Sequence, residues 1–106
     1  MLNYTTGEIS SILNAKLTGN TDRVVKTVSI DSRSVAGGES ILFFALVGQR
    51  HNGHLFIPEL YNFHGIRTFV VSSIENYSKQ LPEATFIHVP DTLQALQRLA
   101  SYHRSK

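Results

Sequence analysis

The sequence has no cysteine, so the chain can form neither a disulfide nor a thiolate metal site, and the redox state of its compartment stays open. It also has no apolar run long enough to span a bilayer, and its first residues lack the apolar core of a signal peptide. We therefore expect a cytoplasmic protein without a membrane span.

The sequence also has no large excess of positive or negative charge. The ten Lys and Arg residues outnumber the eight Asp and Glu by two, and no two basic residues are adjacent. Nucleic-acid binders usually gather basic residues on one face, so this distribution argues against nucleic acid as a partner. With 42% hydrophobic and 17% charged residues, the 106-residue chain has the composition of one globular domain with a modest core.

Motifs of catalysis are absent from the sequence. It contains no G-x-x-x-x-G-K-[ST] loop to cradle ATP phosphates, no G-x-G-x-x-G after a strand, no serine elbow and no H-E-x-x-H. His51, His54 and His64 lie close together in sequence, but no nearby carboxylate or cysteine completes a metal shell. His54 suits a helix start and His64 a helix end, where the dipole favours a cation. We predict no catalytic residue and no metal site.

Alternating periodicities predict both strands and helices. Runs of β-branched and apolar residues predict strands near residues 24–30, 41–47, 66–71 and 85–89. Helices are predicted over about 6–14, 56–64 and 92–104. Capping-box spacing at Thr5/Glu8 and Asp91/Gln94 predicts two of the helix starts, and Gly65 is the expected left-handed residue after the second helix.

Specific apolar residues are expected on particular faces. Val24, Val28 and Ile30 should share one side of the first strand. The expected apolar positions of the last two helices are Phe56, Leu60 and Phe63, and then Leu93, Leu96, Leu99 and Ala100.

This order of elements predicts an α/β fold with a small mixed, mostly parallel sheet flanked by helices, because crossover helices connect parallel strands. The polar turn at residues 31–33 and the polar loop at residues 48–53 would then lie at the same edge. Ligands of α/β proteins usually bind at that edge.

Two interpretations of the turn at residues 31–33 stay open. It can simply end a strand, with Asp31 bonded to its own backbone and Arg33 paired with a surface carboxylate. Alternatively, Ser32 offers a hydroxyl, while the loop at residues 48–53 supplies backbone N–H groups and the Arg50 cation. Such a site suits an anionic, hydrogen-bonding ligand such as a nucleoside diphosphate.

Nearly the whole chain resembles the N-terminal domain of the Mur ligases, which build the peptide stem of bacterial peptidoglycan, and the family-specific motif lies in its central part. The family pattern is D-[ST]-R, a glycine-containing loop, L-F-[VF]-A-[LV]-x-G and [DN]-G-H-x-F-[IV]. The matching residues are Asp31-Ser32-Arg33, Gly38, Leu42-Phe43-Phe44-Ala45-Leu46, Gly48, Asn52-Gly53-His54 and Phe56-Ile57. Two departures are a slightly longer loop before Leu42 and Asn52 in place of the usual Asp, which keeps the capping ability but loses the charge.

The resemblance implies a protein of three domains with separate roles. An N-terminal domain would hold the UDP moiety of a UDP-N-acetylmuramoyl-peptide, a central domain would use ATP and magnesium, and a C-terminal domain would bring the amino component. Carried over by position, the residues expected to contact UDP are Ile30, Ser32, Gln49, Arg50 and His51. The supporting loop positions are Asp31, Arg33, Gly48, Asn52 and Gly53.

Residues 4–9 and 89–96 favour the family member that adds D-alanyl-D-alanine to UDP-N-acetylmuramoyl-tripeptide. The alternatives are the member that adds the third stem residue and a free-standing α/β module that binds a protein partner. Because the last helix is still in register at Ser105-Lys106, we expect residues 1–106 to be one domain of a longer ATP-dependent ligase. Alone, this domain should have no ligase activity.

Overall fold

A computed structural model describes residues 3–30, 38, 40–47, 52–72, 81 and 83–105. The helices are α1 (Thr6–Leu13), the short 3-10 helix η1 (Gly53–Phe56), α2 (Ile57–His64) and α4 (Thr92–Arg104). The strands are β1 (Tyr4–Thr5), β2 (Lys16–Thr18), β3 (Val24–Val25), β4 (Thr27–Ser29), β5 (Ile41–Phe44), β6 (Thr68–Val71) and β7 (Thr85–His88).

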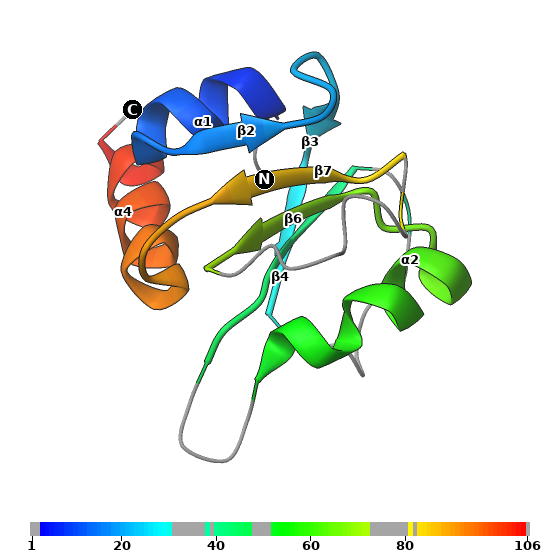
Figure 1. The fold of residues 1–106 in the computed structure, drawn as a ribbon. Coiled ribbons are helices and arrows are strands. Elements are labelled where there is room, and N and C mark those ends of the chain that lie inside the picture. Colours follow the sequence, from blue (N-terminus) through cyan, green and yellow to red (C-terminus); the bar gives the residue numbers. More distant parts are fainter. Residues whose placement is uncertain are drawn as a thin grey trace.

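A five-stranded sheet in the order β2-β7-β6-β5-β4 forms the middle layer of the domain. Strands β4 to β7 are parallel to one another, whereas β2 pairs antiparallel with β7. Helices α1 and α4 cover one face of the sheet and α2 covers the other (Figure 1). The predicted fold, a mixed and mostly parallel sheet flanked by helices, is confirmed.

The predicted strand over residues 24–30 is in fact two strands. β3 pairs with β1 in a separate small sheet, while β4 pairs with β5 in the main sheet. The division occurs at Lys26, because its N–H and that of the next residue both donate to the Ser40 carbonyl. The expected shared side of the strand was therefore wrong: Val25 is fully buried, whereas its neighbour Val24 is half-exposed.

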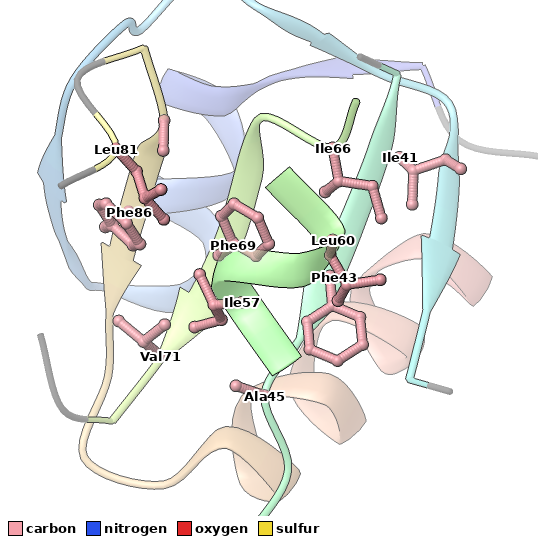
Figure 2. Packing of buried hydrophobic residues seen from close by; sticks show 11 residues of the cluster. Ile41, Phe43, Ala45, Ile57, Leu60, Ile66, Phe69, Val71, Leu81 and Phe86 are labelled. Carbon is pink, nitrogen blue, oxygen red and sulfur yellow. The ribbon is translucent and has the colours of Figure 1, made fainter. Parts of the chain in front are cut away.

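Each face of the sheet has its own hydrophobic core. On the α2 face, the Phe69 ring stacks on Phe86 at a centroid distance of 5.7 Å and meets the edge of Phe43 at 6.3 Å. Ile57 and Leu60 of α2 lie over these rings (Figure 2). The core on the other face joins α1 and α4 to the sheet through Ile9, Leu13, Leu42, Phe44, Val70, Ile87, Ala95 and Leu99.

The three predicted helices are present, but three of their predicted apolar positions do not face the core. Phe63 is 81% exposed and Leu93 is 51% exposed, and Ala100 is exposed as well. The 3-10 turn of η1 precedes α2, and the buried residues of α2 are Ile57 and Leu60. In α4 the buried residues are Thr92, Ala95 and Leu99, which recur at helical spacing from the first turn.

The Thr5/Glu8 capping box is formed as the sequence predicts, whereas the Asp91/Gln94 box shows only its Asp91 half. The Thr5 hydroxyl accepts a hydrogen bond from the Glu8 N–H at 3.1 Å, and the Glu8 carboxylate accepts one from the Thr5 N–H at 2.9 Å. Gly65 follows α2 with φ of 69°, and the Asp91 carboxylate accepts from the Gln94 N–H at 3.1 Å. These caps satisfy backbone groups that have no partner within a helix.

Replacing Thr5 by alanine should lower the free energy of unfolding by about 1 kcal/mol, because the Glu8 N–H loses its acceptor. Thr5→Ser retains the hydroxyl and is the matched control. Urea denaturation followed by circular dichroism measures both. An equal loss in the two variants would contradict a role for the hydroxyl.

Candidate functional site

The four parallel strands end at one edge of the main sheet, which we call the carboxyl edge. Ile30 follows β4, Ala45 follows β5, Ser72 follows β6 and Val89 follows β7. Because β4 and β5 are paired in parallel, their ends lie side by side, with Ser29 opposite Phe43. The sequence predicted a ligand site at this edge.

Three of the predicted site residues belong to the described part of the chain: Ile30, Asn52 and Gly53. The side chain of Ile30 is 46% exposed at the end of β4, so it is accessible to a ligand at the carboxyl edge. The other predicted residues lie outside the described residues, and their roles stay predictions: Asp31, Ser32, Arg33, Gly48, Gln49, Arg50 and His51.

After β5, two short segments of the chain are paired with each other. We call these four residues the loop neck (Leu46, Val47, Asn52 and Gly53). Val47 and Asn52 face each other in an antiparallel bridge, and the Gly53 N–H donates to the Leu46 carbonyl at 2.7 Å. Along the chain, residues 48–51 connect the two sides of the neck. The structure therefore anchors both ends of the segment that carries three of the predicted UDP contacts.

Gly53 is needed in the neck because of a close backbone approach. A Cβ atom at this position would lie 2.9 Å from Cα of Ala45 and 3.0 Å from the Leu46 nitrogen. Asn52 beside it keeps the predicted capping role, since its Oδ1 accepts from the His54 N–H at 3.0 Å and begins η1. Asn52 and Gly53, which the sequence analysis named as supporting loop positions, thus both have a structural role.

His54 has a larger role than the helix start that the sequence predicted. Its side chain is only 5% exposed, and its Nδ1 lies 2.7 Å from Oδ1 of Asn52. Its Nε2 accepts a hydrogen bond from the Ser72 N–H at 3.0 Å. Nε2 of His88 lies 3.1 Å from the Ser72 carbonyl oxygen. The position of His54 in the family pattern was the sequence signal for it, whereas Ser72 and His88 had none.

A surface pocket of about 380 Å³ opens beside the end of β7. Its lining comes from the end of α1, the segment after β7 and the first turns of α4: Leu13, Asn14, Val89, Pro90, Asp91, Gln94, Ala95 and Arg98. None of the three described site residues lines it. Its Asp91 carboxylate already caps α4.

No three His, Asp or Glu side chains gather to hold a metal within the part of the chain that the structure describes. Among the described helices, none is long and apolar enough to cross a membrane.

A family profile described as "Mur ligase family, catalytic domain" matches residues 24–104. The chain belongs to the Mur ligase family. The resemblance that the sequence motifs indicated is thereby confirmed.

Two relatives of this Mur ligase domain are known enzymes. The chain is 32% identical, over its full 106 residues, to UDP-N-acetylmuramoyl-tripeptide–D-alanyl-D-alanine ligase of Haemophilus influenzae, and covers 22% of that protein. It is 33% identical over 94 residues, 88% of the chain, to UDP-N-acetylmuramoyl-L-alanyl-D-glutamate–2,6-diaminopimelate ligase of Bacteroides fragilis, and covers 18% of it. The chain thus spans less than a quarter of either relative.

Solved structures share the fold of this Mur ligase domain. Two crystal structures of MurF from Acinetobacter baumannii match 99% of the chain with TM-scores of 0.82 and 0.83, at 22% sequence identity. The matched part is 22% of each of those chains. At this identity the similarity establishes the architecture of the domain.

Proposed function

We propose that this domain binds the UDP moiety of UDP-N-acetylmuramoyl-tripeptide and anchors that substrate for an ATP-dependent ligase that adds D-alanyl-D-alanine. The observation that carries the proposal is the loop neck, which pairs Val47 with Asn52 after β5, the strand next to β4, and so fixes the two residues that flank 48–51 in the sequence. The family motif assigns UDP contacts to Ile30 and Ser32, at the end of β4 and after it in the sequence, and to residues 49–51. Identity to the H. influenzae ligase supports the choice of substrate.

The chemistry of UDP suits such an edge. Uracil presents an N–H donor between two carbonyl acceptors, a pattern that backbone groups beyond the last paired residue of a strand can match. The half-exposed Ile30 side chain offers apolar contact for the base. The Arg50 guanidinium would bind the diphosphate through charge-assisted hydrogen bonds.

In this proposal, ATP, magnesium and the incoming dipeptide bind to other domains of a longer protein. Residues 1–106 supply substrate anchoring alone, and the purified domain releases no phosphate from ATP. The 33% identity to the B. fragilis ligase supports a second candidate, in which the substrate is the UDP-linked dipeptide that receives diaminopimelate. Both candidates share the UDP moiety, so one experiment tests their common part.

Titration of the domain with UDP should shift the amide NMR signals of Ile30 and residues 49–51 more than titration with ADP. Arg50→Ala should weaken UDP binding by about 1–3 kcal/mol, or roughly 5- to 150-fold, because a charge-assisted contact to phosphate is lost. Arg104→Ala removes the same charge at the exposed end of α4 and should leave binding unchanged. Equal shifts with ADP, or none with UDP, would favour the protein-interaction module instead.

A further inference from the structure

The pocket beside the end of β7 is lined by none of the described residues of the proposed UDP site. It opens between the end of α1 and the first turns of α4, two helices that lie side by side on one face of the sheet (Figure 1). Its volume of about 380 Å³ is typical of small-molecule sites. Three of its lining residues, Leu13, Val89 and Ala95, belong to the core on that face and are at most 7% exposed. The pocket therefore has an apolar floor.

Four exposed polar residues also line this pocket. Asp91 and Arg98 carry opposite charges, while Asn14 and Gln94 carry side-chain amides. Within the part of the chain that the structure describes, the Arg98 guanidinium has no hydrogen bond or ion pair, and the two amides have no hydrogen bond. The Asp91 carboxylate caps α4 through Oδ1, which leaves Oδ2 able to accept from a ligand. The pocket thus offers a cation, an anion and two amides above an apolar floor.

The spacing of the two charges indicates the length of the ligand. Asp91 and Arg98 are separated by two helical turns, or about 10 Å along the axis of α4. Helical side chains lean toward the N-terminus, so the long arginine side chain shortens the gap between the charged groups. In an extended dipeptide the ammonium and the carboxylate lie about 7 Å apart, whereas in a single amino acid both are attached to one carbon atom. A dipeptide can therefore reach both charges.

We propose that this pocket binds a free dipeptide with an aliphatic side chain: Arg98 binds its carboxylate, Asp91 binds its ammonium, and the apolar floor receives its side chain. The amides of Asn14 and Gln94 can donate to and accept from the peptide group of such a ligand. Charge-assisted hydrogen bonds at both ends make the site selective for free termini. The inference is independent of the UDP site and adds a second site to a domain to which the proposed function assigns the UDP moiety alone.

The test titrates the 106-residue chain with glycyl-leucine and follows the amide NMR signals of Asn14, Gln94, Ala95 and Arg98, which should shift until the site is saturated. Four matched ligands each lack one feature. N-acetyl-glycyl-leucine lacks the ammonium, glycyl-leucine amide the carboxylate, glycyl-glycine the aliphatic side chain and leucine the peptide group. Each should bind about tenfold more weakly or worse, because one contact is lost. No shift with glycyl-leucine, or equal binding of either capped ligand, would overturn the inference.

Two substitutions in and beside α4 remove the charges one at a time. Arg98→Gln removes the cation and Asp91→Asn removes the anion, while the asparagine oxygen can still accept from the Gln94 N–H and cap the helix. Both variants should bind glycyl-leucine about tenfold more weakly and melt close to the wild-type temperature. Arg104→Gln, at the exposed end of α4 and outside the pocket, is the matched control and should bind like the wild type. Unchanged affinity in either pocket variant would contradict the proposal.

A competition titration separates this inference from the proposed function. UDP should neither shift the amide signals of the pocket nor displace glycyl-leucine, and displacement would overturn the independent site. A chain that binds glycyl-leucine but not UDP overturns the proposed function alone. A chain that binds UDP but not glycyl-leucine overturns this inference alone.

Discussion

Replacing Phe69 by alanine should lower the free energy of unfolding by about 3–5 kcal/mol, the cost of removing a fully buried aromatic ring. Phe69 is 0% exposed in β6, stacks on Phe86 and meets the edge of Phe43. Its removal leaves a cavity between the sheet and α2 that neighbouring rings can fill only in part. Urea denaturation followed by circular dichroism measures the loss.

Phe63→Ala is the matched control for this prediction. The same ring is removed, but Phe63 is 81% exposed on α2, so the free energy of unfolding should change by no more than about 0.5 kcal/mol. A comparable loss in the two variants would contradict the helical phase that the structure assigns to α2. It would instead support the apolar face that periodicity alone predicted.

Replacing Gly53 by alanine should destabilise the domain by about 1–3 kcal/mol, because the new methyl group overpacks the loop neck. Its neighbours, Cα of Ala45 at 2.9 Å and the Leu46 nitrogen at 3.0 Å, are backbone atoms that cannot turn aside as a side chain would. For a domain of this size, the melting temperature should fall by roughly 4–8 °C per kcal/mol. Differential scanning calorimetry measures this shift.

The Gly53 variant also tests the link between the neck and ligand binding. Under the proposed function, UDP affinity should fall together with stability, since the Gly53 N–H bonds the Leu46 carbonyl across the neck. Ser11→Ala, on the exposed side of α1, should leave both the melting temperature and the affinity unchanged. An unchanged melting temperature in Gly53→Ala would contradict the close approach to Ala45.

Local signals were sufficient for much of the fold. The caps at Thr5 and Asp91 and the left-handed Gly65 lie where spacing predicted them, because each involves residues at most a few positions apart. The alternation of helices and strands was likewise predicted from periodicity, and from it the mostly parallel sheet. In the site, sequence motifs alone singled out Asn52 and Gly53, which the structure places together in the loop neck.

The sequence by itself thus determined the fold class and the helix caps. Only the tertiary structure decided that the first strand is divided at Lys26, that Phe63 faces solvent, and that His54 is bonded to Ser72. The physical reason is the distance along the chain between the groups concerned. The Lys26 break depends on the Ser40 carbonyl, and His54 depends on an N–H that lies 18 residues away, at the end of another strand. Such contacts form only when the sheet brings these groups together, and neither periodicity nor capping patterns encode them.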